Sequence, residues 1–130
     1  GRRKERRMIL GTGIDIIEVE RVKRAAAKEG FMERVFTETE RQRLKSCNND
    51  PQRIAGAFAA KEAVAKALGT GFSEGVTPRG IVVVKTPSGA PQVELDAPSK
   101  KIMDSLGGKK IFLSLTHTKD YAQAFAIITR

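Results

Sequence analysis

Apolar residues change their spacing several times along the chain, and each change predicts a boundary between elements. From Met8 to Ile17 they run almost without a break, interrupted by Gly11 and Gly13, which predicts a buried first strand. From Glu18 they recur at helical spacing with basic residues between them, and Gly30 marks the predicted end of this helix.

The middle of the chain contains two signals for the start of a helix. Thr37 is followed three residues later by Glu40, a capping-box pattern that predicts a short helix through about Lys45. Asp50 and Pro51 supply an N-cap and a favoured first helical residue. A long helix is therefore predicted from this point to Leu68, with a glycine as its stop.

The second half of the chain is richer in strands. A hairpin is predicted from two strands around a Pro/Gly turn, then a helix, and then a final hairpin; the segments are 81–86, 93–95, 98–106, 111–116 and 121–128. Because strands and helices are mixed without a regular βαβ order, the pattern predicts an α+β fold with an antiparallel sheet packed on the long central helix.

Composition limits the class of protein. The 130 residues are enough for one domain, predicted over 8–130, and residues 1–7 form a basic tail with five cationic side chains. No apolar run is long enough to span a membrane. The single cysteine, Cys47, suits a reducing compartment, so we expect a cytoplasmic protein.

The formal net charge of +9 implies an acidic partner. A nucleic-acid-binding module is one interpretation of this charge. Aromatic residues make up only 5% of the chain, Trp is absent, and no nucleic-acid motif is present, which argues against it. An anionic cofactor and an acidic protein are the remaining classes of partner.

The predicted central helix carries the clearest chemical signal. Glu62 lies four residues before Lys66, so the two charges share one face, and the turn of Gly69, Thr70 and Gly71 follows with backbone N–H groups suited to an anion. This layout predicts a phosphate-handling site; the alternative is an ordinary surface ion pair. Lys61 falls within the apolar stripe, either as a lysine that extends past the core to water or as an anion contact.

Two other polar positions fit the same chemistry. Asp15 interrupts an apolar strand, and together with Glu62 it could hold one Mg²⁺; alternatively it caps a helix. The segment Thr116, His117 and Thr118 ends a predicted strand with groups that bind phosphate oxygens, or else simply closes a hairpin.

Three segments, in this order, form a recognisable set: GTGIDI at 11–16, FAAKEAVAKALGTG at 58–71, and SLTHT at 114–118 with Tyr121 and Ala122 after it. Together they resemble the motifs of the 4′-phosphopantetheinyl transferases, specifically the small bacterial holo-acyl-carrier-protein synthases. The resemblance extends over essentially residues 8–130.

The resemblance implies transfer of the phosphopantetheine arm of coenzyme A to a serine of apo acyl carrier protein, for fatty acid biosynthesis. It implies a homotrimer with active sites between subunits. The implied metal ligands are Asp15 and Glu62, which together with Lys66 form the catalytic set. The implied coenzyme A contacts are Lys61, Lys66, Gly69, Thr70, Gly71, Thr116, His117 and Thr118. The implied carrier-protein contacts are Arg21, Arg24 and Arg34.

Some points stay open at this stage. The serine proton could pass to Glu62, to a metal-bound water or to Lys66; water or Glu62 is favoured, because a neutral lysine needs a strongly lowered pKa. Many relatives carry an arginine where this chain has Ala57, and Arg53 lies one helical turn earlier as a replacement. An inactive scaffold that binds the carrier protein without transfer is a further alternative.

Overall fold

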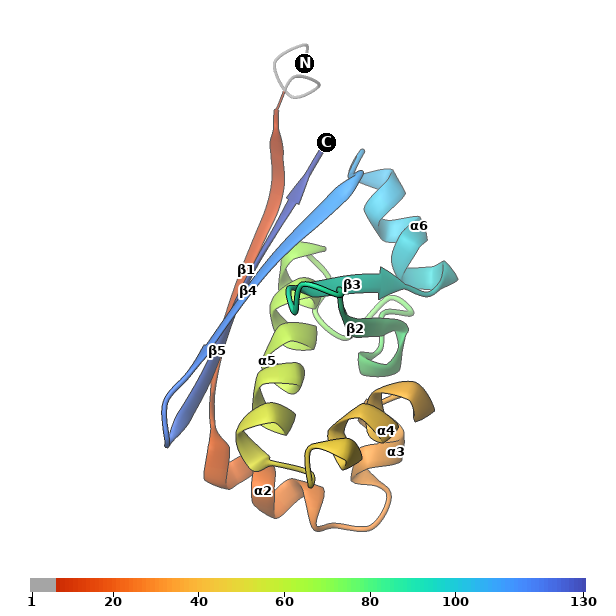
Figure 1. Ribbon diagram of the computed structural model, residues 1–130. Helices are drawn as coiled ribbons and strands as arrows, with labels where there is room; N and C mark the ends of the chain where they lie inside the picture. Colours follow the sequence, from red (N-terminus) through yellow and green to blue (C-terminus); the bar gives the residue numbers. More distant parts are fainter. Residues whose placement is uncertain (1–6) are drawn as a thin grey trace.

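The computed structural model describes residues 7–130, and all of the predicted tail except Arg7 lies outside this range. In Figure 1 the long helix α5 (Pro51–Ala67) lies between a twisted sheet on one side and a smaller hairpin on the other. Three short helices gather at the start of α5, and the last helix lies beside the small hairpin. The predicted α+β class is confirmed.

The larger sheet has the order β1-β5-β4 and is antiparallel throughout. Its strands are β1 (Ile9–Glu18), β5 (Tyr121–Thr129) and β4 (Lys110–His117). The first and last strands of the chain pair directly, with Asp15 opposite Ala124 and Ile14 opposite Phe125. The predicted first strand and the predicted final hairpin are thus both present, in one sheet. The first strand is not buried as predicted, because only one of its faces packs on the core.

Helix α5 packs against one face of this sheet with unusually little between the two backbones. A Cβ atom at Gly11 would overlap the carbonyl oxygen of Ala67, and one at Gly13 would overlap that of Ala63. The helix begins as predicted, because Asp50 accepts a hydrogen bond from the Gln52 N–H at 3.0 Å. The small residues therefore let β1 lie directly on the helix.

The three short helices are α2 (Val19–Ala26), α3 (Phe31–Val35) and α4 (Glu38–Ser46). The helix predicted to run to Gly30 ends at Ala26. Gly30, with φ 83°, instead begins α3, which the sequence pattern did not predict. The capping box at the start of α4 is confirmed, since Thr37 and Glu40 each bind the other's backbone N–H.

The smaller hairpin is β2 (Ile81–Lys85) paired with β3 (Pro91–Leu95), preceded by the 3₁₀ turn η1 (Pro78–Gly80) and followed by α6 (Ala97–Ser105). These elements cover the side of α5 that faces away from the large sheet (Figure 1). The central helix is consequently enclosed on several sides, as its alanine-rich sequence predicted.

The outer face of the large sheet is different. Large apolar side chains stand on it in the open: Ile14, Ile16, Phe112 and Phe125 are 53%, 61%, 54% and 41% exposed. Within residues 7–130 no other element covers this face (Figure 1). Nor does that part of the chain include a helix with the length and apolar character needed to cross a membrane.

Candidate active site

A cleft of about 530 Å³ opens between β1, α2 and α5, and it brings together residues that are far apart in the sequence. Asp15 lines it from β1, Arg21 from α2 and Glu62 from α5. Its walls are otherwise largely apolar, with the rings of Phe31 and Phe58 stacked at a centroid distance of 6.1 Å. We call this the β1 cleft.

Asp15 reaches the β1 cleft because Gly11 and Gly13 hold its strand against α5. The Lys66 ammonium donates to Asp15 Oδ1 at 3.1 Å and to the carbonyl oxygen of Ile14 at 2.9 Å. Asp15 is therefore paired across two elements and does not cap a helix. The alternative of an ordinary Glu62–Lys66 surface pair also fails, since the described partner of Lys66 is Asp15.

Glu62 lies in the same cleft without a cation of its own. Partial burial, and then repulsion from the Asp15 carboxylate, raise the pKa of Glu62 above its ordinary value, while Lys66 acts in the opposite direction. Two carboxylates that repel each other in one cleft are a donor set that suits Mg²⁺, which takes one or two protein carboxylates and completes its shell with water and phosphate. Among the described residues, no larger cluster of acidic, His or Cys side chains is suited to a metal ion.

Lys61 is not at this site. Its ammonium is fully buried and donates to Glu40, to the carbonyl oxygen of Pro78 and to that of Ile81, at 2.9, 2.8 and 2.7 Å. Both interpretations of the sequence need correction here. The side chain does not extend to water, and it has no proton left for an anion. The buried carboxylate of Glu40, 21 residues earlier in the chain, compensates its charge. Burial nevertheless lowers the pKa of Lys61.

The Gly69–Thr70–Gly71 turn is also more occupied than its sequence indicated. The Gly69 N–H donates to the carbonyl oxygen of Lys66 at 2.9 Å, and the Gly71 N–H donates to that of Ala65 at 3.1 Å, so both close the C-terminus of α5. Positive φ angles of 85° and 58° explain the two glycines. An anion at this turn has only the Thr70 N–H as a backbone donor with no acceptor in the described chain.

A second cleft, of about 750 Å³, lies on the opposite side of α5, and we call it the β4 cleft. Thr116 and His117 line it from the end of β4, and Arg43 and Arg53 line it from α4 and α5. Ala57 also lines it, and Arg53, one helical turn earlier, offers a guanidinium to the same space.

Thr118, the third residue of its predicted group, contributes to the hairpin instead. Its hydroxyl accepts the Tyr121 N–H at 3.2 Å, and its carbonyl oxygen accepts the Gln52 side chain at 3.3 Å. The alternative that this segment closes a hairpin is correct for Thr118, whereas Thr116 and His117 are exposed and free to meet a ligand.

The three predicted carrier-protein arginines are exposed but do not share one surface hollow. Arg21 stands in the β1 cleft, and Arg24 lies one turn later on the same helix. Arg34, on α3, lines a separate hollow of about 520 Å³ with Lys28 and Glu33.

Known proteins resemble this chain over nearly its whole length. The model of the 4′-phosphopantetheinyl transferase superfamily matches residues 11–126. A holo-[acyl-carrier-protein] synthase of Alkaliphilus oremlandii is 46% identical over 121 residues, covering 92% of this chain and 98% of that protein. The chain belongs to the 4′-phosphopantetheinyl transferase superfamily.

Solved structures agree with this assignment. A holo-[acyl-carrier-protein] synthase of Neisseria meningitidis has a TM-score of 0.86 at 30% identity, with 95% of this chain and 100% of that one covered. One from Bacillus anthracis, in complex with CoA (3′,5′-ADP), has a TM-score of 0.80 at 34% identity and covers 95% and 98%. The resemblance to phosphopantetheinyl transferases noted from the motifs is therefore confirmed.

For this phosphopantetheinyl transferase the motifs indicated Asp15 and Glu62 and the family resemblance implied Arg21, and the structure places all three in one cleft. The motifs did not indicate Arg43, which lines the β4 cleft and donates to the carbonyl oxygen of Val83 at 2.8 Å. Its position in a basic last turn of α4 was the available signal. The two clefts, separated by α5, remain apart within one chain.

Proposed function

We propose that this phosphopantetheinyl transferase moves the 4′-phosphopantetheine arm of coenzyme A to a serine of apo acyl carrier protein, in fatty acid biosynthesis. The observation that carries the proposal is the β1 cleft, where two carboxylates from different elements meet beside an exposed arginine in a chain of this family. Relatives named holo-[acyl-carrier-protein] synthase, one of them solved in complex with CoA, support it.

In the reaction the serine Oγ attacks the phosphorus that bears the pantetheine arm. A new P–O bond forms, the pyrophosphate P–O bond breaks, and adenosine 3′,5′-bisphosphate leaves with the electron pair. Lys66 donates hydrogen bonds to Asp15 and Ile14 as a charged ammonium, which suits it to stabilise the leaving phosphate rather than to accept a proton. Glu62, or a water molecule in the same cleft, would accept the serine proton.

Asp15 and Glu62 are the proposed ligands of Mg²⁺. When bound there, the cation would offset the charge that accumulates on the diphosphate of the substrate. The fit rests on the two carboxylates that share the β1 cleft and on the mutual repulsion that a divalent cation would relieve.

The β4 cleft is the proposed site for the nucleotide part of coenzyme A. Arg43, Arg53 and His117 give it a concentration of groups that favour phosphate, and Thr116 adds a hydroxyl. Outside this cleft, the proposed coenzyme A contacts are Lys66 on α5 and the Thr70 N–H in the turn that follows it. Lys61 is withdrawn because all three of its protons have acceptors in the protein.

We propose that the active form is a homotrimer, which would bring the β1 cleft of one subunit near the β4 cleft of another. The uncovered apolar face of the large sheet, with Ile14, Ile16, Phe112 and Phe125, supports this because isolated monomers rarely expose so many large apolar side chains together. Light scattering of the active species tests the trimer, and an active monomer would exclude it.

Carrier protein is proposed to dock over α2 and α3, where Arg21, Arg24 and Arg34 are exposed. Acidic residues on the partner would complement them. Arg21→Ala, at the mouth of the β1 cleft, should raise the KM for carrier protein more than the KM for coenzyme A. Equal changes in both constants would remove Arg21 from the docking surface.

The decisive experiment is mass spectrometry of apo acyl carrier protein after incubation with this protein, coenzyme A and MgCl₂. The expected product is carrier protein that has gained one phosphopantetheine, with no gain when MgCl₂ is replaced by EDTA. A carrier protein that is bound but never modified would identify a scaffold instead of an enzyme. A cytoplasmic location, where both substrates occur, belongs to the same proposal.

A further inference from the structure

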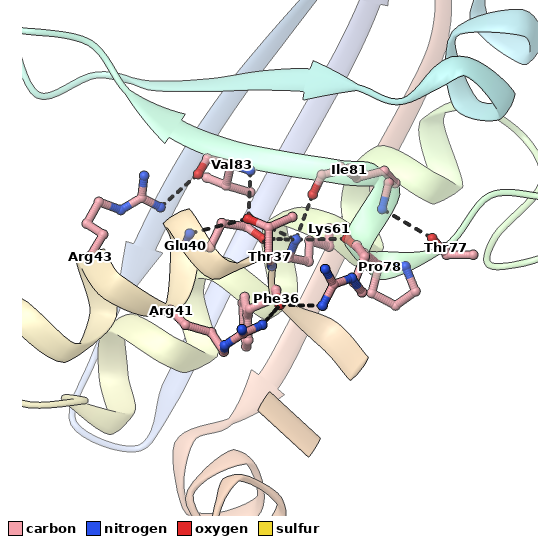
Figure 2. Close-up of polar contacts among 12 residues, drawn as sticks. Phe36, Thr37, Glu40, Arg41, Arg43, Lys61, Thr77, Pro78, Ile81 and Val83 are labelled. Atoms are coloured by element: carbon pink, nitrogen blue, oxygen red, sulfur yellow. Dashed lines mark hydrogen bonds and ion pairs between the residues drawn. The ribbon is translucent and has the colours of Figure 1, made fainter. Parts of the chain in front are cut away.

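The buried ammonium of Lys61 has no part in the reaction proposed above, and its surroundings are unusually well defined (Figure 2). Its three donated hydrogen bonds go to three different elements: to Glu40 on α4, to Pro78 in η1 and to Ile81 at the start of β2. An ammonium has three protons, so every one of them has an acceptor in the protein.

Glu40 is held just as completely. Its Oε1 accepts the Thr37 N–H at 2.8 Å, its Oε2 accepts the Val83 N–H at 2.9 Å, and Lys61 Nζ lies 2.9 Å from each oxygen. Figure 2 shows the carboxylate between α4 and β2, with the ammonium beside it. The pair therefore joins α5 to both elements through short, directional contacts between side chains that are closed to solvent.

The surface of α5 that meets β1 carries few large side chains. Where it meets β1, the contact is between Gly11 or Gly13 and the backbone of Ala67 or Ala63. Helices normally fix their orientation by the interlocking of large side chains, and a surface of alanine and glycine has few to interlock. Polar contacts therefore help to fix the orientation of this helix, together with its few large buried side chains such as Ile54 and Val64.

Helix geometry connects this anchor to the active site. At about 100° per residue, Glu62 and Lys66 lie about 100° and 140° around the axis from Lys61, so both move when the helix turns. Side-chain ends lie about 5–6 Å from the axis, so a rotation of about 10° displaces them by about 1 Å. A displacement of that size can cost a rate factor of about 100 in a positioned reaction.

We propose that Lys61 and Glu40 are positioning residues, whose ion pair fixes the rotation of α5 and thereby holds Glu62 and Lys66 in the geometry that transfer requires. The inference rests on the proposed transferase function. It gives Lys61, the neighbour of Glu62 in the sequence, a role in orienting α5 and none in substrate binding.

The test compares wild type with the double variant Lys61→Met, Glu40→Gln, which removes both charges and nearly preserves volume. Replacing a buried ion pair by uncharged residues is often tolerated by the fold, whereas removing one partner alone is not. The matched control is Lys100→Met, Asp104→Asn, which removes an exposed pair on α6 with a 3.7 Å separation. Each protein is assayed for its urea midpoint, its kcat and its KM for coenzyme A.

We expect the double variant to fold, to keep its KM for coenzyme A within about threefold, and to lose about 10- to 100-fold in kcat per folded molecule. The control should match wild type in all three measurements. If the pair only stabilised the fold, every folded molecule of the double variant would have the kcat of wild type. That result would overturn the inference.

Glu40→Asp decides the question if the double variant does not fold. It keeps both charges and withdraws the carboxylate by one methylene, so a lower kcat at unchanged KM supports the inference, and an unchanged kcat rejects it. Wild type serves as the remaining check. If wild type itself forms no holo carrier protein, the proposed function fails and the inference fails with it; if wild type is active and the variants equal it, only the inference fails.

Discussion

The two sides of α5 each hold a lysine near a carboxylate, yet the two arrangements differ in every physical respect. Lys61 and Glu40 are 0% and 1% exposed and all their hydrogen-bonding capacity is used within the protein. On the other side, Lys66 is 49% exposed and lies near two carboxylates. It forms an ion pair with Asp15 but not with Glu62. A fully satisfied pair fixes the elements that it joins, whereas an unsatisfied cluster in a cleft is available for chemistry.

The largest expected effect is the loss of transfer when either carboxylate of the β1 cleft is removed. Asp15→Ala or Glu62→Ala should lower kcat/KM by about 10³-fold or more. Each variant removes a proposed ligand of the cation that would offset the charge on the reacting phosphate. Transfer is measured by mass spectrometry, and Asp104→Ala, an exposed carboxylate on α6, is the matched control. Turnover near wild type in either cleft variant would contradict the site.

The next effect separates the two lysines by stability. Lys61→Met should lower the free energy of unfolding by about 3–5 kcal/mol, because Glu40 is left buried without its cation. Lys66→Met should cost less than about 1 kcal/mol, since its pair with Asp15 is partly solvated. Urea denaturation of both variants measures the difference. Equal losses would mean that the contrast between the two sides of α5 is wrong.

A smaller effect tests how closely β1 lies on the helix. Gly13→Ala should destabilise the protein by about 1–3 kcal/mol and reduce transfer, because its Cβ would force the strand that carries Asp15 away from Ala63. Gly56→Ala is the matched control, since a Cβ there meets nothing within 4 Å and a helix gains stability from alanine. Thermal unfolding compares the two. A harmless Gly13→Ala would show that the close approach is not required.

The smallest effect concerns the pH dependence of stability. The pKa of Glu62 is raised above 4.5, so its contribution to stability is present below pH 4.5 and is lost as the pH rises through its native pKa. Without metal, Glu62→Gln should therefore be more stable than wild type at pH 7 by roughly a few tenths of a kcal/mol, because the carboxylate is partly solvated. The difference should vanish in acid. Addition of MgCl₂ should stabilise wild type more than the variant.

Prediction from the sequence succeeded where the cause is local. The capping box of Thr37 and Glu40 and the start of α5 at Asp50 depend on residues within three or four positions of one another. It failed at Gly30, which was predicted to end a helix but is the N-cap of α3, because glycine occurs at both ends of helices. The motifs also indicated Asp15 and Glu62, since a carboxylate in an apolar strand or on an alanine-rich helix needs a reason to be there.

By itself the sequence determined most of the elements, the antiparallel α+β class and the family, because these follow from spacing, caps and motifs that short stretches of chain carry. Only the tertiary structure decided which charged side chains pair with one another. Lys61 was assigned to the core rather than the site because its partner lies 21 residues earlier, and Lys66 joined Asp15 across 51 residues. Electrostatic pairing depends on distance in space, and the chain determines that distance only after it has folded.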